Sequence, residues 1–69
     1  MNSDVFRGHW KKLKGDIKMR WARLTDDDLE SIDGAVDKLE GRLQERYGWS
    51  KEQAVRELET WARDRGVSA

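Results

Sequence analysis

Six basic side chains near the start of the chain are the residues best suited to contact a charged partner. Lysine and arginine at these positions could contact phosphate groups: Lys11, Lys12, Lys14, Lys18, Arg20 and Arg23. Contacts to phosphates would weaken with salt and would not depend on nucleotide sequence. The whole chain has a formal net charge of zero, so no domain-wide basic excess supports nucleic-acid binding. Two interpretations stay open for these residues, a solvated helix face or an anion-contacting surface.

Patterns that would indicate catalysis or metal binding are weak. His9 is the only histidine, and a metal site needs several ligands at suitable spacing. A serine nucleophile would need His9 as its base together with an orienting acid, and no spacing indicates such a group. A charged first helical turn explains Asp26, Asp27 and Asp28, whose spacing is not that of a calcium-binding loop. We therefore expect no enzyme activity, no cofactor and no metal.

The size and composition indicate a small folded protein. A length of 69 residues allows one domain over residues 1–69, with residues 66–69 as a frayed tail. No cysteine is present to form a disulfide, and no apolar run is long enough for a signal peptide or a membrane span. A charged fraction of 41% approaches that of disordered chains, whereas four tryptophans favour a buried core. We expect a monomeric cytoplasmic protein.

The sign of the charge changes along the chain. Residues 1–24 hold seven basic and two acidic side chains, a net charge of +5, whereas residues 25–40 hold one basic and seven acidic ones, a net charge of −6. Attraction between these segments within one fold explains the pattern, and a basic helix that meets an anionic partner is the alternative. Opposite charges four residues apart also predict ion pairs within helices: Asp16–Arg20, Glu52–Arg56 and Glu59–Arg63.

Apolar residues spaced three and four apart predict amphipathic helices. The first set indicates one helix that opens near Ser3 or Asp4: Phe6, Trp10, Leu13, Ile17, Trp21 and Leu24. The second set follows Thr25, a predicted N-cap: Leu29, Ile32, Val36, Leu39, Leu43 and Tyr47. Because the sequence Asp33-Gly34 interrupts the second set and glycine disfavours helix, we expect a short helix near 26–32 and a longer one near 34–47.

A last helix should follow Gly48, which is a suitable C-terminal cap. The S-x-x-Q sequence of Ser50 and Gln53 indicates a capping box at its start. Its apolar side carries four residues: Ala54, Leu58, Trp61 and Ala62. We expect the core to join residues from all three sets: Trp10, Leu13, Ile17, Trp21, Leu39, Leu43, Leu58 and Trp61.

The chain partly repeats itself after a shift of 26 residues, which indicates a doubled helical unit. The shift aligns glycines, lysines and apolar residues of the two units: Gly8 with Gly34, Trp10 with Val36, Lys12 with Lys38, Leu13 with Leu39, and Gly15 with Gly41. The four glycines lie roughly opposite the apolar stripes. They therefore indicate a second contact face, local looseness, or simple tolerance on solvated faces.

Three stretches of the sequence resemble the CsbD-like family of small bacterial stress proteins, and in particular its YjbJ branch. They are W-K-K-L-K-G at 10–15, W-A-R-L-T-D-D-D-L at 21–29 and L-E-G-R-L-Q-E-R-Y-G-W-S-K-E-Q-A at 39–54. The resemblance covers nearly the whole chain and includes the repeated L-x-G element at Leu13–Gly15 and Leu39–Gly41. It implies a compact helical bundle similar to SAM-domain folds, and it supplies no catalytic residues. The four tryptophans depart from the aromatic-poor composition of many relatives and favour a folded protein.

These observations together predict an all-α, compact bundle of three or four short helices built on a degenerate two-unit repeat. The expected function is that of a non-enzymatic general stress-response protein that acts by protection or through a protein partner. The alternative is an anion-binding module that contacts nucleic acid or an anionic membrane surface through the basic first helix.

Overall fold

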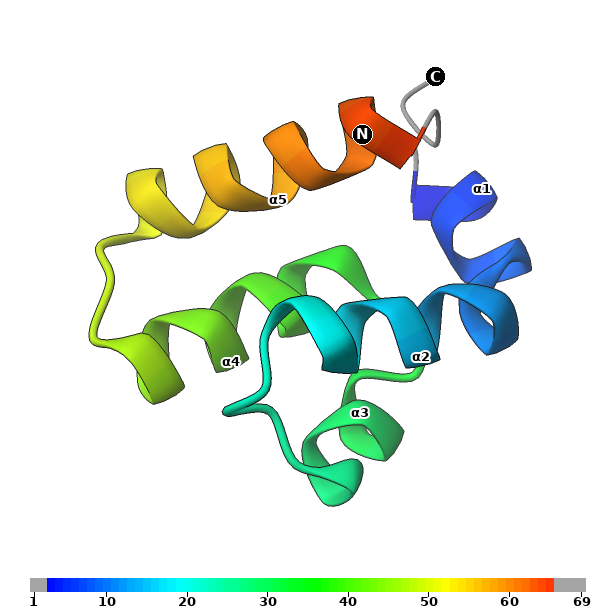
Figure 1. Cartoon of the computed structure of the whole chain (residues 1–69), viewed down its shortest axis with the longest axis horizontal. Helices are drawn as coiled ribbons and strands as arrows, with labels where there is room; N and C mark the ends of the chain where they lie inside the picture. The colour runs from blue at the N-terminus through cyan, green and yellow to red at the C-terminus, as the bar shows by residue number, and fades with distance from the viewer. Residues whose placement is uncertain (1–2, 66–69) are drawn as a thin grey trace.

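The computed structural model describes residues 3–65, and these residues form five α-helices (Figure 1). The helices are α1 Ser3–Gly8, α2 Trp10–Arg20, α3 Asp26–Ile32, α4 Val36–Tyr47 and α5 Lys51–Arg65. In Figure 1, α4 and α5 run antiparallel, and α3 lies on the side of α4 away from α5. The all-α bundle is confirmed, with five helices where the sequence indicated three or four. The predicted frayed tail, residues 66–69, lies outside the described residues.

The single first helix expected from the spacing of Phe6 to Leu24 is wrong. The chain leaves helical geometry at His9, whose φ and ψ are −107° and 11°, and α2 then ends at Arg20. The Gly8 that precedes the break is a poor helix former, and His9 provides no side-chain cap for α2. The break divides the first repeat into α1 and α2, just as the second repeat is divided into α3 and α4.

The hydrophobic core gathers residues from every helix, and the eight residues expected in it are all buried. Among residues 3–65, the buried apolar side chains are Phe6, Trp10, Leu13, Ile17, Trp21, Leu24, Leu29, Ile32, Leu39, Leu43, Ala54, Leu58, Trp61 and Ala62. The ring of Trp61 on α5 lies 6.4 Å from that of Phe6 and 5.8 Å from that of Trp21, measured between centroids. Aromatic pairs at such distances add stability beyond the area that they bury. The last helix therefore packs against residues at both ends of the first repeat.

The predicted interruption at Asp33-Gly34 is confirmed as a left-handed turn between α3 and α4. Asp33 has a φ of 45° and Gly34 a φ of +79°. A Cβ on Gly34 would lie 3.0 Å from the Cα of Arg7, so this turn packs closely against α1. By contrast, a Cβ on Gly8, Gly15 or Gly41 would meet nothing within 4 Å. Of these four glycines, Gly34 alone makes a close contact with another helix of the described chain.

An ion pair between the buried Asp28 and the exposed Arg46 joins the start of α3 to the end of α4. Thr25 caps α3 as predicted, and it forms a capping box in which the Asp28 N–H donates to Thr25 Oγ1 and the Thr25 N–H donates to Asp28 Oδ2, both at 3.0 Å. The Arg46 guanidinium donates to both Asp28 oxygens at 2.8 Å. These bonds from Arg46 hold the pKa of Asp28 far below its usual value, although burial acts in the opposite direction.

Other ion pairs join α2 to α5, whereas the pair between Arg42 and Glu45 lies within α4. Asp16 on α2 pairs with Arg65 on α5, and Arg20 lies 4.0 Å from Glu57. The predicted Asp16–Arg20 pair is therefore wrong, because each residue has a partner across the bundle. The predicted pairs Glu52–Arg56 and Glu59–Arg63 are also not formed within residues 3–65.

The connection from α4 to α5 follows the predicted caps. Gly48 has a φ of +68° and ends α4, and the Gln53 N–H donates to Ser50 Oγ at 3.1 Å. The Gln53 side chain donates to Glu57 instead of completing the capping box. Trp49 is half-buried and stacks on Tyr47 with centroids 4.5 Å apart. The connection is thus ordered by both a cap and an aromatic stack.

Alanine substitutions should have opposite effects at the glycines. Gly34→Ala should destabilise the protein by about 1–2 kcal/mol because it forces a left-handed residue to carry a Cβ that also meets the Arg7 backbone. Gly15→Ala, in the middle of α2 with open space around it, should stabilise by about 0.5–1 kcal/mol. Urea unfolding curves check both values. A stabilising Gly34→Ala would contradict the described turn.

Asp28→Asn should remove the charge that Arg46 binds and cost about 1.5–3 kcal/mol at neutral pH. Because folding lowers the pKa of Asp28, its contribution is present above the unfolded value of about 3.9 and is lost as the pH falls below that value. The difference in melting temperature between the wild type and Asp28→Asn should therefore shrink from pH 7 to pH 3. The matched control is Asp27→Asn, whose side chain is exposed in the same turn. If both variants lowered the melting temperature equally at every pH, the result would contradict the ion pair between Asp28 and Arg46.

Candidate anion-contacting surface

Three of the six predicted anion-contacting side chains have partners within the protein. Lys18 donates to Asp26, and Arg20 lies near Glu57. Arg23 lies over the Tyr47 ring, with its guanidinium carbon 5.2 Å from the centroid. The hydrogen bond from Lys18 lowers the pKa of Asp26, and the charge of Lys14 adds to the effect. The charge change noted along the sequence therefore produces contacts between the two repeats.

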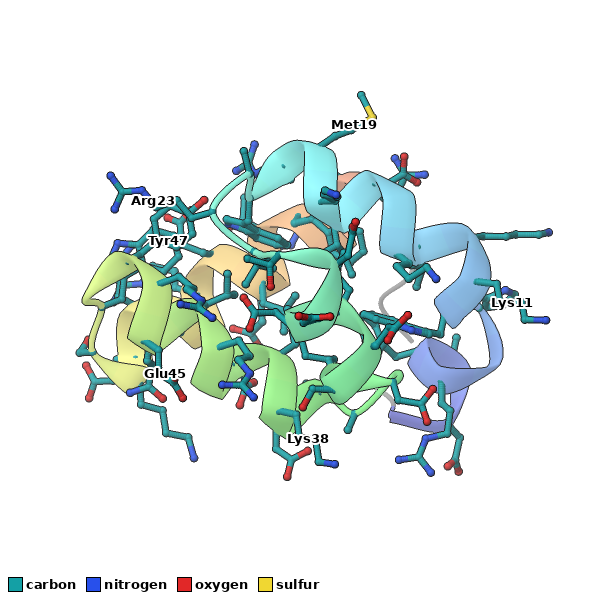
Figure 2. All side chains as sticks on the ribbon, turned by 90° about the horizontal axis from the view of Figure 1, so that it is seen from below. Lys11, Met19, Arg23, Lys38, Glu45 and Tyr47 are labelled. Carbon is teal, nitrogen blue, oxygen red and sulfur yellow. The ribbon has the colours of Figure 1, made fainter. Side chains whose placement is uncertain are left out.

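Arg23 belongs to a cluster with Arg46, Tyr47 and Trp49 that the sequence did not indicate. Arg23 donates through Nη1 to the Arg46 carbonyl and through its backbone N–H to Tyr47 Oη, both at 3.4 Å. Tyr47 in turn stacks on Trp49. Figure 2 shows Arg23 and Tyr47 together at one end of the molecule. This cluster joins Arg23 to residues 46–49, and no local pattern predicts that contact.

The other three residues, Lys11, Lys12 and Lys14, are exposed and line a groove at the opposite end. The groove has a volume of about 890 Å³ and lies between the α1–α2 break and the α3–α4 turn. Figure 2 shows Lys11 at the end of the molecule opposite Arg23 and Tyr47, and Lys38 at the lower edge between the two ends. The six residues do not form one continuous surface, because they divide between this groove, the ion pairs and the aromatic stack.

Two further cations in the groove were missed from the sequence. Arg7 lies on α1 and Lys38 on α4, so both are separated from the lysines of α2 by a helix break or by a whole repeat. The alignment of Lys12 with Lys38 in the 26-residue repeat was the available signal for one of them. Nothing in the local sequence around Arg7 places it in the groove.

The residues considered for catalysis and metal binding do not form a site within residues 3–65. His9 is exposed at the groove, and no group of three or more histidine, aspartate or glutamate residues within residues 3–65 is arranged to hold a metal ion. Asp26 and Asp28 have the partners already described. None of the helices in the described part of the chain has the length and apolar character needed to cross a membrane.

The comparisons with known proteins agree on one family. A family described as CsbD-like matches residues 4–56. UPF0337 protein PA4738 of Pseudomonas aeruginosa is 62% identical over 58 residues, which cover 84% of this chain and 89% of that protein. UPF0337 protein ECA0631 of Pectobacterium atrosepticum is 52% identical, and UPF0337 protein YjbJ of Escherichia coli K12 is 49% identical; each match spans 61 residues and 88% of both chains. The chain therefore belongs to the CsbD-like family, on the branch that includes YjbJ.

Proposed function

We propose that this protein is a non-enzymatic stress-response protein that acts through its folded surface on a protein partner. The observation that carries the proposal is the placement of its polar groups. Within residues 3–65, Asp28 is the one buried charged side chain, and Arg46 and Thr25 already bind its oxygens. Enzyme sites usually contain ionisable groups whose pKa is shifted for reaction inside a cleft. Here the strongest pKa shift belongs to a structural ion pair.

The packed core favours action by a folded surface over protection by an unordered chain. In the described part of the chain, fourteen apolar side chains are buried, among them three of the four tryptophans. Disordered protective proteins lack the apolar content for such a core. The family to which the chain belongs supports the stress-response part of the proposal, because the resemblance that identified it is to small bacterial stress proteins.

A second candidate function is contact with nucleic acid or an anionic membrane surface. It is favoured by the exposure of Lys11, Lys12 and Lys14 on one helix. It is weakened by the partners of Lys18, Arg20 and Arg23, because phosphate contacts would have to replace them. A membrane contact through the apolar stripe of α2 would also expose the core residues that this stripe provides.

Deletion of the gene in its host should lower survival under osmotic, acid or oxidative stress and leave growth in unstressed minimal medium unchanged. A plasmid copy of the wild-type gene should restore survival. A nutrient requirement of the deletion strain would indicate an enzyme, because loss of a metabolic reaction limits growth without stress. Full rescue by a Leu39→Asp variant that circular dichroism shows to be unfolded would contradict action through a folded surface.

A further inference from the structure

The groove between the α1–α2 break and the α3–α4 turn lies where the two repeats meet. Three pairs of residues that the 26-residue shift aligns lie on its walls: Arg7 with Asp33, His9 with Ala35, and Lys12 with Lys38. The close contact between Gly34 and the Arg7 backbone joins the two walls. Its volume of about 890 Å³ falls within the range of ~300–1,000 Å³ that is typical of ligand-binding clefts. The same doubled unit that forms the core therefore also forms this concave surface.

The groove carries more positive than negative charge. Five cationic side chains line it, Arg7, Lys11, Lys12, Lys14 and Lys38, against the two carboxylates of Glu30 and Asp33. All seven are exposed. Within residues 3–65, Lys11, Lys12 and Lys38 form no ion pair. A concave surface with an excess of one sign concentrates the electric field and attracts the opposite charge.

The apolar residues in the groove limit the type of anion that fits. Trp10, Ile32 and Ala35 contribute to its lining, and Trp10 is only 8% exposed because its ring packs against Phe6 at 5.6 Å. Proteins that bind single-stranded nucleic acid usually offer exposed aromatic faces for base stacking, and this ring offers almost none. The carboxylates of Glu30 and Asp33 would also repel a continuous run of phosphates.

We propose that this groove binds an acidic segment of a partner polypeptide. Carboxylates spaced along the segment pair with Lys11, Lys12 and Lys38, and its uncharged side chains contact the partly exposed Ala35 in the lining. A polypeptide can leave uncharged positions opposite Glu30 and Asp33, which a nucleic acid cannot do. The inference rests on the proposed function, since it names the chemistry of the protein partner.

Titration of the full-length, ¹⁵N-labelled protein with a peptide of alternating glutamate and alanine tests the proposal. Saturable shifts should appear at the amides of Lys11, Lys12 and Lys38 and at the Trp10 indole N–H. The same peptide with glutamine in place of glutamate should produce no saturable shift. Shifts that are absent, or that centre on Arg23 and Tyr47, would overturn the assignment of the groove.

Charge-reversal variants distinguish peptide binding at the groove from attraction to the overall charge of the protein. Lys12→Glu combined with Lys38→Glu should weaken peptide binding about tenfold or more, because two attractive pairs become repulsive. Arg56→Glu combined with Arg63→Glu makes the same change in net charge at exposed positions of α5 and should keep the affinity within about threefold. Circular dichroism confirms that each variant is folded. Equal losses for both pairs would show that overall charge, not the groove, determines binding.

Two other anions test the class of partner. Single-stranded oligothymidylate and phosphatidylglycerol vesicles should bind more weakly than the glutamate peptide at physiological salt. Tighter binding of either one at the groove would overturn the polypeptide assignment in favour of nucleic acid or membrane. The stress-survival assay reports on the proposed function independently: a survival defect without peptide binding refutes the groove alone, and peptide binding without a survival defect refutes the proposed function alone.

Discussion

The contact of Trp61 with Phe6 and Trp21 is the constraint on which the rest of the structure depends. A chain of 69 residues without cysteine has only a small core to hold it together. Trp61 lies on the last helix, whereas Phe6 and Trp21 flank the first long helix, so this one side chain joins the two ends of the described chain. The ion pair between Asp16 and Arg65 links the same helices at the surface.

The internal repeat connects folding with the proposed binding surface. In both units a short helix is followed by a break and a longer helix, and the breaks at His9 and Asp33-Gly34 lie at nearly equivalent positions. The second unit is acidic and the first is basic, so they attract each other through Lys18–Asp26. Lys11, Lys12 and Lys38 near the breaks line the groove and form no ion pair with the residues that the structure describes. The opposite charges of the two units therefore stabilise their contact at Lys18 and Asp26, and an excess of positive charge remains at the groove.

Sequence periodicity was sufficient for the core and the caps because these depend on local spacing. The buried residues Leu13, Ile17 and Leu39 follow directly from the apolar stripes. The break at His9 was missed because the apolar spacing continues through it, although Gly8 and the repeat alignment to Gly34 were available signals. The pairing of Asp16 with Arg65 depends on how α2 and α5 cross, and the groove depends on how the two repeats pack. Neither arrangement is encoded in the spacing of neighbouring residues.

Nuclear Overhauser contacts of the Trp61 indole measure the central interaction most directly. In a well-dispersed amide spectrum of the purified protein, we expect contacts from this indole to the rings of both Phe6 and Trp21. Contacts to both rings would establish that α5 closes the bundle over the first repeat. A collapsed spectrum, or a Trp61 indole without contact to either ring, would contradict the folded core and with it the groove that the packed repeats create.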